Sequence, residues 1–99
     1  MRYQVRYTRA AREDLMRLYR FLLERDAQAA ARALEAIGQG VSVLRNFPFS
    51  CRKADAANPF LRELIISFGA WGYVMLFEIE YSEQVTILAV RRQREDDYH

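Results

Sequence analysis

The sequence predicts a single α+β domain over residues 1–99: an N-terminal strand, an antiparallel helix hairpin, then a three-strand antiparallel meander. Three observations predict this order. The first residues alternate between polar and apolar, the middle of the chain carries apolar side chains at helical spacing, and the last third contains strand-like runs. A length of 99 residues with 52% hydrophobic content suits one domain with one core.

The N-terminal segment, residues 2–8, predicts a half-buried strand. Tyr3, Val5 and Tyr7 share one face of this segment, and the residues between them are polar. Because successive side chains of a strand point to opposite sides, the three apolar residues would face a core.

Two helices are predicted to follow. Thr8 fits the N-cap of the first helix, which stops near Arg25, and Asp26 fits the N-cap of the second, because both side chains can accept a backbone hydrogen bond in the first turn. Pro48 ends the second helix. The short connection favours an antiparallel hairpin. The apolar stripes of the two helices are Ala11, Leu15, Leu18 and Leu22, and Ala30, Leu34, Ile37, Val41 and Leu44.

The last third of the chain predicts three consecutive strands. They span residues 61–68, 72–80 and 85–91, with short turns between them, and residues 47–60 before them form the longest irregular stretch. Apolar residues occupy both faces of the middle strand. That pattern indicates a central strand which is covered on both faces, or one whose second face awaits a partner.

The composition excludes several classes of site. Cys51 is the single cysteine, so no internal disulfide is possible, and with the single histidine it cannot form a structural zinc site. We expect no metal and no small-molecule cofactor. Without a leader-like N-terminus or a long apolar run, we expect no membrane association and a cytoplasmic location. Fourteen of the fifteen cations are arginine, which suits the binding of anionic surfaces but also fits a codon bias.

Four segments carry a resemblance to a known family. They are YQVRYTRAAREDLMRLYRFL, AAARALEAIGQGVSVLRNFP, LRELIISFGAWGYVMLFEI and VTILAVRRQREDDYH, which together span nearly the whole chain. In these segments and in its element order the chain resembles the RelE/ParE superfamily of toxins from bacterial type II toxin–antitoxin systems. The resemblance implies a compact sheet with a packed helix hairpin, a cognate antitoxin as partner, and a cytoplasmic target.

The resemblance also implies two modes of action. RelE-like members enter the ribosome and cleave mRNA, whereas ParE-like members poison DNA gyrase. Cleavage at a ribose 2′-hydroxyl needs a general base, a general acid and cations that stabilise the phosphorane. The residues that could serve in cleavage or in target binding are Arg52, Lys53, Arg62, Arg91, Arg92, Arg94 and Tyr98, with His99 at the end.

Two features favour the binding mode. Arg92 stands where related sequences often carry histidine, so the best-placed acid–base candidate is missing. His99 is the last residue of the sequence and follows the acidic run Glu95–Asp97, which would repel RNA phosphates. We therefore expect a ParE-like toxin that inhibits DNA gyrase by protein binding and has no catalytic residue. The alternatives are a domain that is no longer toxic, or a RelE-like ribosome-dependent endoribonuclease that uses Arg62, Arg91 and Tyr98.

Several roles stay open. Arg62 either contacts the target or forms a structural contact with Glu63, with Glu78 or with helix carbonyls. Tyr98 either joins the site or pins the tail to the body, and the acidic run is either solvated or paired with helix arginines. The irregular stretch 47–60 and the tail are the expected target-facing pieces. For the antitoxin we expect an apolar groove beside the helix hairpin or an open sheet edge.

Overall fold

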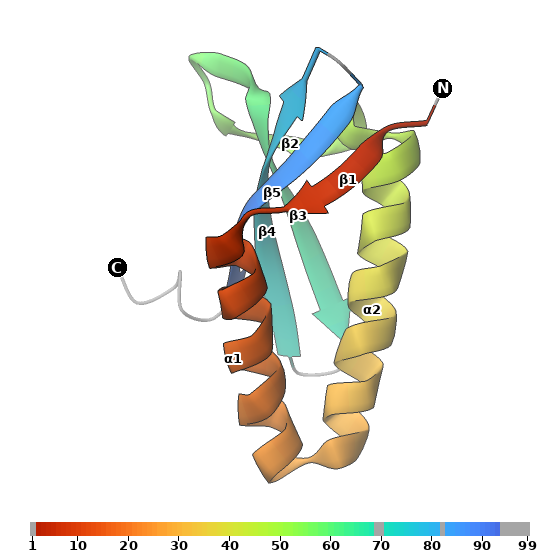
Figure 1. Ribbon diagram of the computed structural model, residues 1–99, viewed down its shortest axis with the longest axis vertical. Helices are drawn as coiled ribbons and strands as arrows, with labels where there is room; N and C mark the ends of the chain where they lie inside the picture. Colours follow the sequence, from red (N-terminus) through yellow and green to blue (C-terminus); the bar gives the residue numbers. More distant parts are fainter. Residues whose placement is uncertain (1, 69–70, 82, 94–99) are drawn as a thin grey trace.

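One five-stranded sheet and a helix hairpin make up the protein (Figure 1). The computed structural model describes residues 2–68, 71–81 and 83–93. The elements are β1 (Gln4–Tyr7), α1 (Arg9–Arg25), α2 (Ala27–Asn46), a short 3₁₀ helix η1 (Pro48–Ser50), β2 (Arg52–Asp55), β3 (Asn58–Phe68), β4 (Trp71–Glu80) and β5 (Gln84–Arg92). This order confirms the predicted α+β class.

The strands lie in the order β1-β5-β4-β3-β2. The predicted meander of β3, β4 and β5 is confirmed, and β1 joins it by pairing in parallel with β5. The N-terminal strand therefore lies beside the last strand, and β5 becomes an interior strand of the sheet.

The stretch predicted to be irregular, residues 47–60, contains more structure than expected. It holds η1, the start of β3 and the added strand β2, which pairs antiparallel with β3. The side chains of Asp55 and Asn58 shape the turn between β2 and β3 by accepting hydrogen bonds from the backbone N–H groups of Ala57 (2.9 Å) and Phe60 (3.0 Å). Strand β2 carries no recognisable strand signal because it is exposed throughout and has no apolar alternation.

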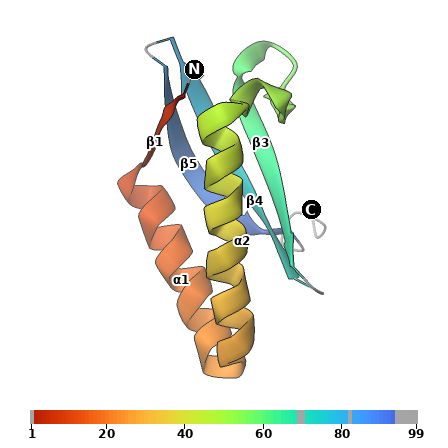
Figure 2. The same ribbon diagram turned by 90° about the vertical axis from the view of Figure 1, so that its right-hand side faces the viewer.

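Both helices cover the same face of the sheet (Figure 2). The predicted N-caps are confirmed: Thr8 Oγ1 accepts from the Ala11 N–H at 3.1 Å, and Asp26 Oδ1 accepts from the N–H groups of Gln28 and Ala29 at 3.0 and 3.1 Å. Asp26 also donates its own N–H to the carbonyl of Leu22 at 2.7 Å. One residue thus ends α1 and begins α2, which makes the hairpin tight. None of the helices in the described ranges is long and apolar enough to span a membrane.

A bulge in β5 is held by the start of α1. Between the pairs Phe77–Ile87 and Leu76–Ala89 the register of β4 and β5 shifts by one residue, so Leu88 is the extra residue. The Thr8 N–H donates to the carbonyl of Ile87 at 3.0 Å, and the Thr8 hydroxyl donates to that of Leu88 at 3.3 Å. Because of the extra residue, the alternation of side chains shifts by one position at the bulge. Ile87 before the bulge and Val90 after it therefore both face the helices.

The bulge is fixed a second time, one turn further along α1. The carboxylate of Asp14 accepts the N–H of Val90 at 3.0 Å. Both Ile87 and Val90 are fully buried against the helices. On β4 the helix-facing residues that join the same core are Tyr73, Met75, Phe77 and Ile79.

Helix α2 lies close against β3 at Gly40. A Cβ added there would lie 2.9 Å from Cδ1 of Ile66 and 3.1 Å from Cδ2 of Leu64, both on β3. At Gly38, which is exposed and two residues earlier, an added Cβ would meet nothing within 4 Å. The two glycines of α2 therefore have different roles, and only Gly40 belongs to the packing of the fold.

Substitution of the two glycines tests this packing. Gly38→Ala is expected to raise the free energy of unfolding by about 1 kcal/mol, because alanine favours helix and meets no neighbour. Gly40→Leu is expected to lower it by about 1–3 kcal/mol, because the larger side chain must displace Ile66 and Leu64. Urea denaturation measures both changes. A stabilising Gly40→Leu would show that α2 does not pack as closely on β3 as described.

Candidate target-binding surface

The face of the sheet that points away from the helices carries the first part of the candidate site. We call it the outer face. Since Tyr73, Met75 and Phe77 face the helices, the residues between them on β4 point outward. A hollow of about 110 Å³ lies on this face, and it is lined by Glu63, Val74, Leu76, Ala89 and Arg91.

The hollow explains the unusual pattern of the middle strand. Val74 and Leu76 form an apolar floor on the outer face, while the alternate residues of β4 belong to the core. Among the described elements, both helices lie on the other side of the sheet (Figure 2). Val74 is only 7% exposed and Leu76 is partly buried, so the apolar floor is recessed within the hollow and is not an open apolar surface.

Charged side chains border the apolar floor. Arg52 of β2 lies opposite Glu63 of β3, and its Nε is 3.0 Å from Glu63 Oε1. Their side chains are 58% and 28% exposed, so this ion pair contributes little stability, but it does compensate the carboxylate beside the hollow. Arg91 of β5 is exposed and forms no hydrogen bond or ion pair with any residue in the described ranges.

Arg62 is occupied by backbone contacts. Its Nε donates to the carbonyl of Pro59 at 2.6 Å, and its Nη1 donates to the carbonyls of Cys51 at 2.8 Å and Phe49 at 3.2 Å. The guanidinium also lies over the Phe49 ring, 5.3 Å from its centroid. Of the roles left open for Arg62, this geometry corresponds to the contact with helix carbonyls, because Phe49 belongs to η1.

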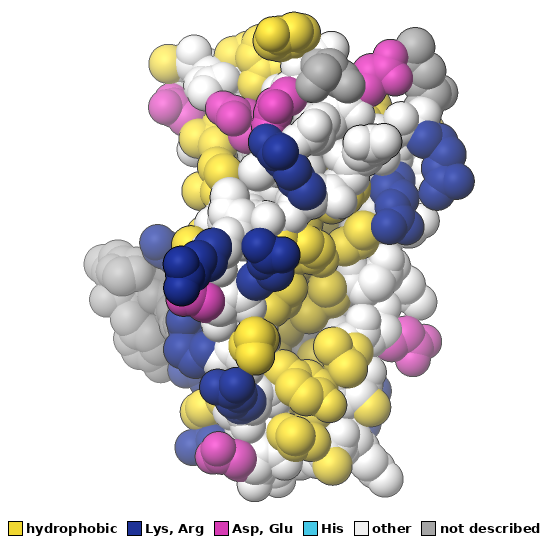
Figure 3. All heavy atoms as spheres, in the orientation of Figure 1, with side chains coloured by type: hydrophobic (Ala, Val, Ile, Leu, Met, Phe, Trp, Pro, Cys, Tyr) yellow, Lys and Arg dark blue, Asp and Glu magenta, His cyan; other side chains and the backbone are white. Residues whose placement is uncertain are grey.

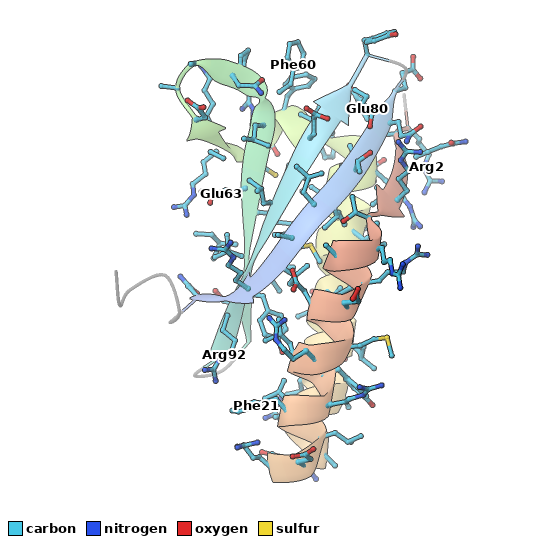
Figure 4. The ribbon with its side chains drawn as sticks, turned by 60° about the vertical axis from the view of Figure 1, so that its left-hand side comes forward. Arg2, Phe21, Phe60, Glu63, Glu80 and Arg92 are labelled. Carbon is cyan, nitrogen blue, oxygen red and sulfur yellow. The ribbon has the colours of Figure 1, made fainter. Side chains whose placement is uncertain are left out.

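Arg92 lies on the helix side of the sheet. Its guanidinium is 4.7 Å from the centroid of the Phe21 ring on α1, and Figure 4 shows the two side chains together, well away from Glu63. Burial raises the pKa of the nearby Tyr73 above 10.0, and the charge of Arg92 offsets part of that rise. Arg91 and Arg92 are neighbours in sequence but lie on opposite faces, because side chains of a strand alternate.

The remaining predicted residues fall into two groups. Lys53 lies on β2 opposite Arg62 and is exposed. Arg94, Tyr98, His99 and the acidic run Glu95–Asp97 lie outside the described residues. The seven predicted site residues therefore do not form one described cluster: Arg52 and Arg91 share the outer face, while Arg62 and Arg92 make contacts on the other side.

Cys51 does not supply a reactive nucleophile. Burial raises the pKa of the Cys51 thiol above 9.0, so the thiol stays protonated at neutral pH and is a poor nucleophile. Sequence reasoning missed the ion pair of Arg52 with Glu63 and the apolar floor, although the apolar residues on both faces of β4 were a signal for the floor.

Two apolar grooves lie near the helices. A trough of about 60 Å³ between α1 and α2 is lined by Leu15, Tyr19, Ala33, Leu34, Ile37 and Tyr73, and apolar side chains gather there in Figure 3. A second groove of about 200 Å³ runs between α2 and β3, and its apolar wall includes Val43, Leu64 and Ile65. Beside this second groove β3 continues past β2, because the pairing of β2 with β3 extends only to Glu63.

Comparisons with known proteins agree with this architecture. The family model described as the ParE toxin of the type II toxin–antitoxin system, parDE, matches residues 5–97. Toxin RelE3 of Caulobacter vibrioides is 36% identical over 86 residues, which are 86% of this chain and 88% of that protein. A chain of the chromosomal ParDE TA system from P. aeruginosa has the same fold, with a TM-score of 0.68 at 20% identity, covering 91% of this chain and 95% of that one.

Conservative substitutions of Arg62 and Arg91 test which of the two arginines stabilises the fold. Arg62→Lys is expected to lower the free energy of unfolding by about 1–3 kcal/mol. The reason is that the single ammonium group of lysine cannot donate to the same three carbonyls as the planar guanidinium does. Arg91→Lys is the control and is expected to change it by less than about 0.5 kcal/mol. Chemical denaturation measures both. If the two variants were equally stable, Arg62 would not hold the β2–β3 region in place.

Proposed function

Because this chain belongs to the ParE toxin family of type II toxin–antitoxin systems, we propose that it inhibits DNA gyrase by protein binding and is neutralised by a cognate antitoxin. The separation of the basic residues supports the binding mode. Arg62 and Arg92 are engaged in contacts within the domain, whereas Arg91 stands exposed beside an apolar floor. An exposed cation at the rim of an apolar patch suits the recognition of an acidic protein surface.

The described residues offer little for the cleavage of RNA. General acid–base catalysis needs two groups with suitable pKa values near the reacting atoms. The carboxylate that lines the same hollow as Arg91 is Glu63, and it is paired with Arg52. These features favour a toxin that inhibits its target by binding to it and not by cleaving RNA.

The second candidate is ribosome-dependent mRNA cleavage. The relative that is 36% identical is named a RelE toxin, and this name favours the endoribonuclease reading for a related chain. Under that reading Arg62, Arg91 and Tyr98 would contact the RNA and stabilise the developing charge.

For the antitoxin, we propose that an extended segment binds the groove between α2 and β3. The part of β3 beyond Glu63 is not paired with β2, so its open edge can accept a further strand. Val43 is 38% exposed on the helix side of this edge, and Ile65, also 38% exposed, lies on the outer side beside Val74, so side chains of an added strand would cover both. Strand addition would supply affinity through backbone hydrogen bonds, and the groove would supply specificity.

A supercoiling assay tests the proposed target. Purified toxin at a concentration equal to that of gyrase is expected to stop the supercoiling of relaxed plasmid. Arg91→Ala is expected to weaken this inhibition about tenfold, as for the loss of an interfacial charge. Arg32→Ala on α2 is the matched control, since Arg32 is equally exposed but lies on the helices.

Two results would contradict the gyrase proposal. One is unaffected supercoiling in the presence of stoichiometric toxin. The other is codon-specific mRNA cleavage in a translating extract that is lost in Tyr98→Phe, which would establish the second candidate.

Substitution in the groove tests the antitoxin surface. Val43→Glu and Ile65→Lys are each expected to weaken binding of the antitoxin encoded beside this gene at least about tenfold, because a charge would be buried in the groove. Met16→Glu is the control, because Met16 is comparably exposed but lies on α1, outside this groove. Calorimetric titration measures the affinities. Unchanged binding by both groove variants would place the antitoxin elsewhere.

A further inference from the structure

A second cleft lies at the end of the sheet where the β2–β3 turn and the β4–β5 turn meet. Its volume is about 410 Å³, and it is lined by Asn58, Phe60, Glu78, Ile79, Glu80 and Tyr81. Figure 4 shows Phe60 and Glu80 at this end, apart from Glu63, Phe21 and Arg92. We call it the acidic cleft. It shares no lining residue with the outer-face hollow or with either apolar groove.

Aromatic rings form part of the wall of the acidic cleft. Phe60 is 47% exposed, and the Tyr81 side chain is fully exposed at the start of the β4–β5 turn. Phe60 is supported from behind by Phe49, because the two rings meet edge to face with centroids 6.1 Å apart. Solvent-facing aromatic rings of this kind can stack on a planar cation.

The two carboxylates of the acidic cleft differ in their partners. Glu80 accepts a hydrogen bond from the Thr86 hydroxyl at 2.6 Å and lies 3.6 Å from Nη2 of Arg6, so its charge is compensated. Glu78 is half-buried and forms no hydrogen bond or ion pair within the ranges that the structure describes. A half-buried carboxylate beside exposed aromatic rings favours a cationic ligand, because the cation would gain both an ion pair and a contact with a ring face.

We propose that the acidic cleft binds an arginine side chain presented by a partner protein. Arginine fits better than lysine because its planar guanidinium can stack on a ring while donating to a carboxylate. The same chemistry already occurs within this chain, where the guanidinium groups of Arg25 and Arg92 lie 3.7 and 4.7 Å from the centroid of the Phe21 ring. The ligand is therefore a basic segment, opposite in charge to the partner expected for Arg91.

Titration with a short peptide tests this proposal without gyrase or antitoxin. The probe is an acetylated and amidated Gly-Gly-Arg-Gly-Gly peptide, added to ¹⁵N-labelled toxin and followed by amide chemical shifts. Shift changes are expected at the residues that line the acidic cleft, with a Kd on the order of a few millimolar, because a single exposed guanidinium gains only one ion pair and one ring contact. The same peptide with citrulline, which keeps the shape but lacks the charge, is expected to bind at least fivefold more weakly.

Three variants locate the site. Glu78→Gln and Tyr81→Ala are each expected to weaken binding of the arginine peptide at least threefold, and the amide spectrum reports whether each variant is folded. Glu83→Gln is the control, because Glu83 is an exposed carboxylate of the same turn that does not line the cleft. Equal binding of the citrulline peptide, shift changes centred outside the cleft, or unchanged affinity in both Glu78→Gln and Tyr81→Ala would overturn the proposal.

Discussion

The arrangement of the whole sheet depends on the contact between the start of α1 and the bulge of β5. Thr8 and Asp14 bind backbone groups on both sides of Leu88 and so fix the extra residue in place. Because side chains alternate along a strand, removing that residue would turn every later side chain of β5 to the other face. Val90 would leave the core, Arg91 would point toward the helices and Arg92 would point outward. The hydroxyl and the carboxylate on α1 therefore decide which arginine reaches the outer face.

Most of the fold could be predicted because its signals are local. The caps at Thr8 and Asp26 and the apolar spacing of the helices are properties of short segments. Strand β2 could not be predicted, since it is exposed throughout and is held by its pairing with β3. The bulge could not be predicted either, because the bond between Asp14 and Val90 joins residues 76 positions apart. The candidate site could be predicted only in part for the same reason. Arg91 and Arg92 are adjacent in the sequence and were grouped together, but in the sheet they lie on opposite faces.

The molecule presents surfaces of opposite character although its net charge is only +2. Arg91 gives the outer face an exposed cation, Glu78 gives the acidic cleft a carboxylate that has no ion-pair partner among the described residues, and the groove along α2 is mostly apolar. Surfaces with different chemistry recognise different ligands, so binding at one need not block another. The groove proposed for the antitoxin and the acidic cleft share no lining residue, so their two proposed ligands need not compete.

The parallel pairing of β1 with β5 has a consequence for biosynthesis. It joins residues that are 80 positions apart, for example through the hydrogen bond from Arg6 to Thr86. The helix hairpin can form from local contacts while the chain is still being made, but β5 must insert between β1 and β4 after all the other described elements have been translated. Since β5 carries Arg91 and one side of the outer-face hollow, the surface proposed for the target is completed only after the last described strand has been made. The order of translation thus delays the formation of this surface in the cell that makes it.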